Sequence, residues 1–452
     1  GAHIIRLEEN YRSVGNILDA ANAVISHNAG RMGKTLRTER ESGEKIKIKR
    51  LENQNEEARY IINKISELAQ REERKFSDFA VLYRVNAQSN NLENTFARSG
   101  IPYRILGGMR FFERKEVKDI VAYLSLIANH ADDMRLMRII NVPKRAIGTS
   151  TVEHVARIAA EEGAPMLEIA RNASDYPALQ RVSFKLEQFY ALIADLAKFA
   201  AEHSLSALVE EVVARTGYLA MLRDSPEDRD KEEIVQEFVS SAKLFEETSE
   251  SPGLSAFLED IALVSDTDNY DADAEAVSMM TVHSAKGLEF PFVFLCDTAR
   301  LFNKSDTRAS VLVHPALGLG PKCTDLEHGV EYPTIARQAI AAQLLTETLS
   351  EEMRLLYVAM TRAKERLIIT GTTHSIAKTT GWLEATASAP LPPELLRGMA
   401  SPLFWLLQSA LLDRDERFLR RNYVYLKPDA AAERAETETG PALPEPDPAL
   451  LA

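Results

Sequence analysis

Cysteine is nearly missing from this chain of 452 residues, which contains only Cys296 and Cys323. Two thiols are too few for a disulfide framework, a zinc site or an iron–sulfur cluster. No apolar run is long enough to span a bilayer, and the opening segment, GAHIIRLEEN, lacks the pattern of a signal peptide. We therefore expect a cytoplasmic protein of a reducing compartment, with no metal site of its own and no membrane partner.

A phosphate-binding loop of the form GxxxxGK[ST] is also missing from the sequence. Residues 30–35, GRMGKT, resemble its end, but Asn28 stands where the first glycine is required. A helix pattern precedes this segment, whereas a phosphate-binding loop follows a strand. We interpret GRMGKT as the C-terminal turn of a helix.

The formal net charge of −13 is unusual for a protein that binds nucleic acid. Residues 225–275 contain sixteen acidic and three basic residues, so this one region holds the whole excess. The remainder of the chain is balanced, which leaves room for a local basic groove. Residues 266–275 lack the central glycine and the terminal glutamate of an EF-hand loop, and we interpret them as a linker.

Strand and helix patterns alternate at both ends of the chain, and a length of 452 residues predicts two or three domains. The patterns predict strands at 45–51, 79–85, 103–106, 277–280, 293–295 and 367–370, and helices at 17–25, 55–68, 87–99 and just before residue 361. Between about residues 116 and 264 only helical patterns occur. Neither α/β segment is long enough for a full sheet. The expected fold class is therefore α/β, a parallel sheet domain interrupted by a large all-helical insertion.

The corresponding boundaries are 1–114 for the first part of the sheet domain, 115–265 for the helical insertion, 266–276 for the acidic linker and 277–376 for the second part. Residues 377–452 are expected to hold a helical segment and a disordered linker. Ile4 and Ile5 suggest a further strand, and Ser13 is a candidate cap for the helix that follows. Residues 298–350 are expected to form an irregular surface insertion that leads into a helix.

Polar and charged side chains follow several of the predicted strands. In a parallel sheet, ligands bind at the turns beyond the carboxyl ends of the strands. We therefore expect one edge of the sheet to gather Tyr11, Arg12, Arg84, Asn86, Thr281, His283 and Arg362. Tyr11 is equally compatible with a surface turn. Arg362 either clamps a phosphate through paired hydrogen bonds or forms an ion pair with a neighbouring carboxylate.

A basic turn, PKRAIGTSTV, interrupts the helical patterns. The backbone amides around Gly148, with Lys144 and Arg145, form a candidate site for a DNA phosphate. Thr149 and Ser150 are candidate caps of the next helix. An ordinary connection between helices accounts for the same residues, and the sequence leaves both interpretations open.

Five ordered sequence blocks resemble the motifs of a known family. They are LEENYRS (7–13), YRVNAQS (83–89), GGMRFFER (107–114), TVHSAKGLEF (281–290) and LLYVAMTRAKE (355–365). In this order they resemble the second half of superfamily 1 DNA helicases of the UvrD, Rep and PcrA kind. The resemblance covers Leu7 to about Thr372. It implies a RecA-like subdomain, called 2A, with an inserted helical subdomain, called 2B.

The resemblance also implies roles for individual residues. Tyr11 would stack on adenine, and the catalytic residues Arg12 and Arg362 would contact the γ-phosphate. Glu289 would bind the ribose hydroxyl, and Gly287 would also belong to the nucleotide-binding residues. The residues implied to contact single-stranded DNA are Arg84, Asn86, Thr281 and His283, and those implied to contact the duplex are Lys144, Arg145 and Gly148. The last of these implications is weakened, because residues 146–148 read AIG where UvrD-like proteins usually have GIG.

The implied activity is that of an ATP-dependent helicase moving 3′ to 5′, with ATP and Mg²⁺ as cofactors. Its implied partners are single-stranded DNA, junctions of single and double strands, and an N-terminal RecA-like domain of the same protein. That domain's phosphate-binding loop is missing here, so we expect a helicase fragment that is inactive as an ATPase on its own. From about residue 296 onward, segments such as RLFN and SPLFWLLQSAL are similar to the AddA subunit of helicase–nucleases. A nuclease subunit or domain is therefore a further expected partner.

A second hypothesis makes the chain a non-catalytic DNA-binding or regulatory module that retains the helicase fold. The two hypotheses differ in what precedes Gly1 in the open reading frame. A phosphate-binding loop encoded there favours the helicase.

Overall fold

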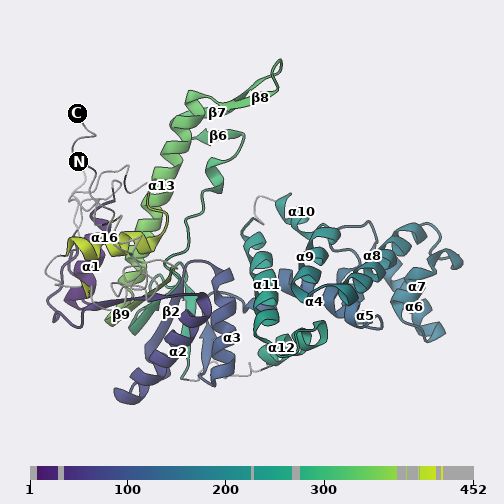
Figure 1. Cartoon of the computed structure of the whole chain (residues 1–452), viewed down its shortest axis with the longest axis horizontal. Helices are drawn as coiled ribbons and strands as arrows, with labels where there is room; N and C mark the ends of the chain where they lie inside the picture. The colour runs from purple at the N-terminus through teal and green to yellow at the C-terminus, as the bar shows by residue number, and fades with distance from the viewer. Residues whose placement is uncertain are drawn as a thin grey trace, which may run out of the picture. The chain divides into compact units, whose positions relative to one another are not determined.

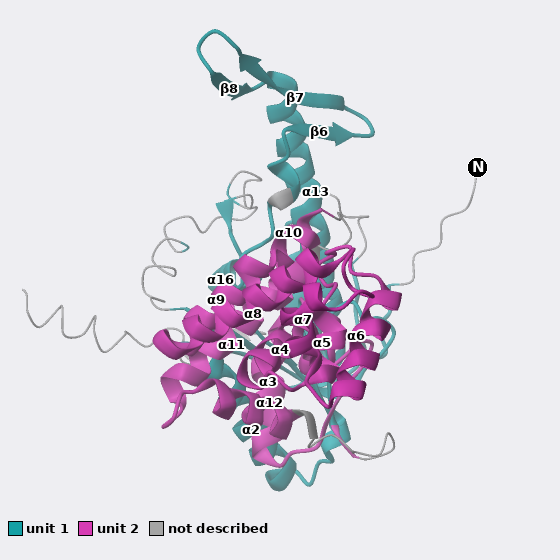
Figure 2. Ribbon diagram, turned by 90° about the vertical axis from the view of Figure 1, so that its right-hand side faces the viewer, with its two compact units in different colours: residues 1–84, 277–452 teal, residues 85–276 magenta. Residues whose placement is uncertain are grey.

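The computed structural model describes residues 8–28, 35–224, 229–266, 275–373, 383, 395, 398–413 and 419–420. They belong to two compact units, one from residues 1–84 and 277–452 and the other from residues 85–276 (Figure 2). Some predictions lie outside the described residues: the strand at Ile4 and Ile5, the turn at residues 30–34, most of the acidic linker and the C-terminal linker.

A parallel sheet forms the centre of the first unit (Figure 1). Its strands follow the order β10–β1–β9–β5–β2–β4, and the neighbours in this order are parallel. They are β1 (Ile46–Leu51), β2 (Phe79–Tyr83), β4 (Val277–Thr281), β5 (Phe290–Leu295), β9 (Ala363–Thr372) and β10 (Leu419–Arg420). Strands from the two ends of the chain are interleaved, so neither end can form the sheet alone. The predicted α/β class is confirmed.

Helices cover the faces of this sheet (Figure 1). The helices α1 (Gly15–Ile25), α13 (Ile335–Met360) and α16 (Pro402–Leu412) pack together, whereas α2 (Gln54–Arg71) packs on β1 and β9 from the other side. Met353, Leu356, Tyr357 and Met360 recur at offsets of three and four near the end of α13, which predicts one apolar face; Met353, Leu356 and Met360 are buried, and Tyr357 is half-buried. This end of α13 is therefore held firmly on the sheet.

Ser13 does not cap α1 as predicted. The N-cap residue is Val14, which offers no side-chain hydrogen bond, and the helix begins at Gly15. The buried Ser13 hydroxyl instead donates to the carbonyl of Ala363 at 2.7 Å. The Val14 N–H also donates to the carbonyl of Lys364, at 3.1 Å. The start of α1 is thereby tied to the start of β9, which places Arg12 beside Arg362.

The insertion at residues 298–350 is more regular than predicted. It contains β6 (Val311–His314), β7 (Gly318–Asp325) and β8 (Val330–Pro333), which form a three-stranded antiparallel sheet on the first half of α13 (Figure 1). Burial alternates along β6, but its outward-facing side chains, Val311 and Val313, are also apolar, so the sequence VLVH does not show the strand pattern. A Cβ on Gly320 would lie 2.6 Å from the Cα of Arg337, so only glycine permits this close approach to the helix.

The second unit is mainly helical, as predicted. Its elements are α3 (Ser89–Ser99), β3 (Tyr103–Ile105), α4 (Lys115–Ala128), α5 (Asp133–Ile139), α6 (Thr149–Glu162), α7 (Met166–Arg171), α8 (Ser183–Glu202), α9 (Leu205–Thr216), α10 (Tyr218–Arg223), α11 (Arg229–Thr248) and α12 (Leu254–Asp266), with short 3₁₀ turns between some of them. Buried side chains from Phe111 to Ile261 form one hydrophobic core. The compact unit begins at Val85, ahead of the boundary after residue 114. That subdomain boundary stays a prediction.

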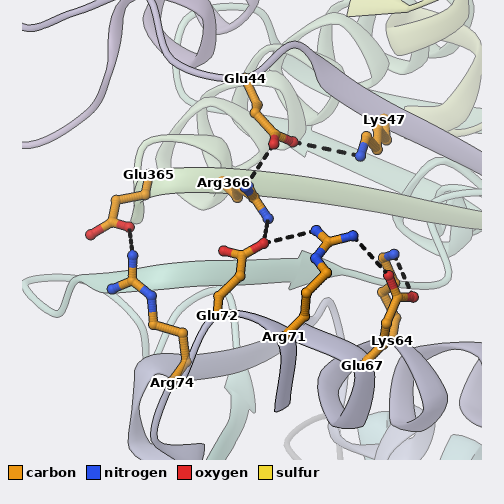
Figure 3. A network of polar contacts seen from close by, with 9 residues as sticks. All are labelled: Glu44, Lys47, Lys64, Glu67, Arg71, Glu72, Arg74, Glu365 and Arg366. Atoms are coloured by element: carbon orange, nitrogen blue, oxygen red, sulfur yellow. Dashed lines mark hydrogen bonds and ion pairs between the residues drawn. The ribbon is translucent and has the colours of Figure 1, made fainter. Parts of the chain in front are cut away.

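A network of ion pairs joins α2, β1 and β9 (Figure 3). Arg366 is at its centre: its two terminal nitrogens lie 2.6 Å from carboxylate oxygens of Glu44 and of Glu72. Arg71 contacts the same Glu72 oxygen at 2.8 Å, and the Arg366 guanidinium lies over the ring of Phe292. The network links three elements that are distant in sequence.

Glu57, in the first turn of α2, has a buried carboxyl group. Its Oε1 accepts a hydrogen bond of 2.9 Å from the backbone N–H of Asp297, the residue that follows Cys296 after β5. Burial and, next, the negative charge of Asp297 raise the pKa of Glu57 to about 7. The native protein therefore keeps a proton on Glu57 at a pH where the unfolded chain has lost it.

This pKa shift predicts a pH-dependent stability. Between pH 4.5 and about 7 the unfolded state binds fewer protons at Glu57, so the free energy of unfolding decreases as the pH rises through this window. Glu57→Gln retains an acceptor oxygen for Asp297 and removes the titration. We expect the free energy of unfolding of Glu57→Gln, relative to the wild type, to increase by roughly 2–3 kcal/mol from pH 5 to pH 8 in chemical unfolding. The exposed Glu351→Gln is the control, and parallel curves for Glu57→Gln and the wild type would contradict the expectation.

Candidate functional site

The candidate residues of the first unit lie at opposite edges of the sheet, so the predicted gathering at one edge is wrong. Thr281 ends β4 and Arg84 directly follows β2, at the carboxyl ends. Glu289 and Arg362 directly precede β5 and β9, at the amino ends. The strands are parallel, and α13 runs against them, so the end of α13 delivers Arg362 to the amino edge.

Arg362 is a buried cation at the amino edge, with 9% of its surface exposed. Its Nε donates to the carbonyl of Val358 at 3.0 Å and its Nη1 donates to the carbonyl of Leu288 at 3.2 Å. Val358 is in the last turn of α13, where carbonyl groups lack helical partners and attract cations. Burial and, next, the charge of Arg12 lower the pKa of Arg362. A guanidinium group remains charged at neutral pH even so.

Glu289 lies between two cations at the same edge. Arg12 Nε is 2.7 Å from its Oε2, and Lys364 Nζ is 3.2 Å from its Oε1. Hydrogen bonds from Arg12 and Lys364 hold the pKa of Glu289 below its usual range. The structure therefore brings Arg12, Glu289 and Arg362 together, as the sequence motifs imply.

The backbone at Arg12 is fixed by polar contacts. The Asn10 Oδ1 accepts hydrogen bonds from the N–H groups of Arg12 and Ser13, at 2.8 and 2.9 Å, which is the geometry of an Asx turn. The guanidinium of Arg40 donates to the carbonyl of Arg12. Tyr11 lies within this turn and is 81% exposed, so its ring faces solvent.

Gly287 shapes the approach to Glu289. Its φ of +92° lies in a region that residues with a side chain rarely adopt. The chain turns there between Ala285, which is buried, and the exposed Leu288, whose carbonyl accepts from Arg362. Gly287 therefore contributes backbone conformation to the amino edge.

At the carboxyl edge, Arg84 forms a two-pronged ion pair with Glu352 of α13. Its Nη2 is 2.6 Å from Oε1 and its Nε is 2.9 Å from Oε2. His283 lies in the field of this pair: burial and, next, the charge of Arg84 lower the pKa of His283. The hydroxyls of Thr281 and Ser284 are 3.0 Å apart, and the N–H of Ser284 donates to Thr281 Oγ1. Thr281 thus orders the turn that carries His283.

The remaining candidates belong to the second unit. Asn86 begins a 3₁₀ turn (Asn86–Gln88), and its Oδ1 lies 3.4 Å from the position that a Cβ would take at Gly108. The GGMRFFER loop therefore approaches Asn86 closely. Its next part is held by the buried Glu93, whose carboxylate accepts from the N–H of Phe111 at 3.0 Å.

In the basic turn at residues 143–152, Arg145 contacts the protein and Lys144 faces solvent. Arg145 donates to the carbonyls of Ile139 and Pro143, both at 3.2 Å, and to the hydroxyl of Tyr123 at 2.8 Å. Lys144 is exposed. Arg145 therefore stabilises the turn, as an ordinary helix connection requires.

The helix after this turn does not use the predicted caps. Gly148 is the N-cap of α6, in an extended conformation, and Thr149 and Ser150 already belong to the helix. The exposed Gly148 leaves the first amides of α6 accessible to an acceptor, because no side chain covers them at this position.

The sequence motifs did not identify Lys364 or Glu352 as members of these sites. Lys364 is two positions after Arg362, at the start of a strand. Side chains two positions apart in a strand point to the same face, so this spacing could have indicated that Lys364 lies near Arg362. Glu352 is two turns before the end of α13, and its partner Arg84 is 268 positions away along the chain. Only the fold shows that pairing.

Two features are absent from the part of the chain that the structure describes. Among the residues with described coordinates, no group of three or more His, Cys, Asp or Glu side chains could hold a metal ion. No helix in the described part of the chain is long and apolar enough to cross a membrane.

Comparison with known proteins gives a consistent result. Residues 5–374 match the family described as the UvrD-like helicase C-terminal domain. The ATP-dependent DNA helicase PcrA of Staphylococcus epidermidis is 39% identical over 376 residues, which are 82% of this chain and 47% of that protein. The protein of the same name from Bacillus subtilis is 38% identical over 378 residues, 82% of this chain and 46% of that protein. The chain spans about half the length of these relatives. With a RecA-like parallel sheet and a matching family signature, the chain belongs to the UvrD-like helicase C-terminal domain family.

Proposed function

We propose that this chain is the second motor domain of an ATP-dependent DNA helicase or translocase that moves 3′ to 5′ along a single strand. The observation that supports this best is the arrangement at the amino edge. Arg362 and Arg12 lie within range of each other's charge; Arg12 contacts Glu289, and main-chain carbonyls hold Arg362. Two cations held together in this way suit a ligand with several negative charges.

The amino edge has a group for each part of a nucleotide. The buried Arg362 supplies a fixed positive charge for the γ-phosphate, whose negative charge is redistributed during phosphoryl transfer, and Arg12 supplies a second. The exposed ring of Tyr11 is available to stack on adenine. A carboxylate has about four acceptor positions, so Glu289 can accept a ribose hydroxyl while it pairs with Arg12 and Lys364.

The carboxyl edge has the features of a single-strand site. Arg84 supplies a positive charge for a backbone phosphate, and Thr281 and the neutral imidazole of His283 supply polar contacts. In the second unit, Asn86, Lys144 and the amides near Gly148 are proposed as further DNA contacts. The contacts of Arg145 support a role in shaping this turn.

ATP hydrolysis requires a phosphate-binding loop that this sequence does not contain. We propose that an N-terminal RecA-like domain of the same protein supplies the loop and holds Mg²⁺, for which the described residues here offer no ligand cluster. Single-stranded DNA and its junctions with duplex are the proposed partners. A nuclease subunit or domain stays a prediction from the AddA-like segments.

Binding of a fluorescent oligothymidylate by the purified chain tests the single-strand site. We expect weak binding that decreases steeply with salt, because phosphate contacts release counterions. Arg84→Ala should weaken it and reduce the slope of log K against log salt by about 0.7. Arg354→Ala is the matched control, since Arg354 is an exposed arginine of α13 that pairs with Glu351. Binding without salt dependence, or equal slopes in both variants, would refute the site.

A further inference from the structure

Helix α13 connects the two edges of the sheet. Glu352 lies near the carboxyl edge, beside Arg84, and Arg362 follows the end of the helix at the amino edge. Arg362 is ten positions after Glu352, which corresponds to about 15 Å at the helical rise of 1.5 Å per residue. Buried Met353, Leu356 and Met360 hold this part of α13 on the sheet. The backbone that carries Glu352 is therefore fixed against the sheet.

The contact between Glu352 and Arg84 is stronger than a usual surface ion pair. Both carboxylate oxygens participate, with Nη2–Oε1 at 2.6 Å, Nε–Oε2 at 2.9 Å and Nε–Oε1 at 3.2 Å. The side chain of Glu352 is only 15% exposed, and that of Arg84 is 39% exposed. Paired hydrogen bonds fix the plane of a guanidinium as well as its position. Only a carboxylate can accept in this way from both nitrogens without donating in return.

The neighbouring Glu351 provides a contrast. It pairs with Arg354 at 2.8 Å through a single contact, and its side chain is 58% exposed. Glu351 carries the same negative charge as Glu352 at the adjacent position of α13. The two glutamates thus separate the effect of a negative charge from the effect of orienting Arg84.

We propose that Glu352 is a positioning residue that fixes the guanidinium plane of Arg84 for a backbone phosphate of single-stranded DNA. The inference rests on the proposed function, in which Arg84 contacts the strand. In this role Glu352 itself touches no DNA. It keeps Arg84 in one orientation before the strand arrives, so that less conformational freedom is lost on binding.

A double-mutant cycle on oligothymidylate binding tests this role. Glu352→Gln is expected to weaken binding about three- to tenfold relative to Glu351→Gln, although both remove one negative charge. Arg84→Lys keeps the positive charge and loses the paired geometry, so it should weaken binding by a similar factor. Because both changes remove the same orientation, the double variant should be no weaker than Arg84→Lys alone.

Two further measurements accompany the cycle. The NMR titration of His283, assigned with His283→Gln, should show a lower pKa in Glu352→Gln, because the carboxylate of Glu352 raises it in the wild type. Thermal unfolding identifies any variant that is not folded. If Glu352→Gln is not folded, Arg84→Lys paired with Glu352→Asp, which keeps the charge and shortens the side chain, completes the same cycle.

The outcomes separate this inference from the proposed function. Wild-type protein that does not bind the oligonucleotide overturns both. Wild-type binding that Arg84→Lys weakens, with equal affinities in Glu352→Gln and Glu351→Gln, overturns the positioning role alone. Tighter binding by Glu352→Gln than by Glu351→Gln also overturns it, since Glu352 would then be a competitor for Arg84. If the losses of affinity in Glu352→Gln and Arg84→Lys add up in the double variant, the positioning role is also overturned.

Discussion

Replacing Arg362 with alanine is expected to lower the kcat of ATP hydrolysis by about 10³ or more, in a protein that joins this chain to a motor domain with a phosphate-binding loop. The reason is geometric. Arg362 is buried, and two main-chain carbonyls hold its guanidinium in place before any ligand is bound. A fixed charge of this kind needs no reorganisation during phosphoryl transfer. The measurement is steady-state hydrolysis at saturating ATP and single-stranded DNA.

Two variants sharpen this experiment. Arg354→Ala removes an exposed arginine from the same helix and should leave kcat within about twofold, since it changes only a surface ion pair. Arg362→Lys keeps a charge but cannot span the two carbonyls, and we expect it to remain well below the wild type. Turnover by Arg362→Ala at the wild-type rate would refute the assignment.

Replacing Arg366 with alanine is expected to lower the free energy of unfolding by about 2–3 kcal/mol, an amount between those of surface and buried ion pairs. Arg366 is the shared partner of Glu44 and Glu72 and also covers the ring of Phe292 (Figure 3). Its loss leaves the half-buried carboxylate of Glu72 and the exposed carboxylate of Glu44 with fewer cations near the amino ends of the strands. Urea unfolding at neutral pH measures the change.

Arg71 provides the matched control for Arg366. It contacts the same oxygen of Glu72 at 2.8 Å, but its side chain is 58% exposed. Arg71→Ala should therefore cost less than about 1 kcal/mol. Equal losses for the two arginines would show that the position of Arg366 in the network has no special importance.

The sheet could be predicted from the sequence because its strands are buried on both faces. FAVLY, at residues 79–83, is buried throughout, and a short, continuous apolar run is typical of an interior strand in a parallel sheet. The antiparallel sheet at residues 311–333 could not be predicted in the same way. Its outward side chains, among them Val313 and Leu319, are exposed although they are apolar, so the polar and apolar residues do not alternate.

The candidate residues could be named from the motifs, but their positions required the fold. Arg362 precedes its strand and Arg84 follows its strand, so the parallel sheet separates them to opposite edges. The partnership of Arg84 with Glu352 joins segments 268 positions apart, and no local pattern indicates it. Ser13 shows the same limit: its position suits a helix cap, but the proximity of β9 gives its hydroxyl a better acceptor in the carbonyl of Ala363.

In the proposed function, this chain forms one wall of a nucleotide site that another motor domain completes. Measuring ATP hydrolysis by the purified chain alone, with and without single-stranded DNA, tests this most directly. The predicted result is no hydrolysis above the buffer rate in either case, because Arg12 and Arg362 have no phosphate-binding loop opposite them in this sequence. ATP turnover by the chain alone that increases with DNA would contradict the proposal.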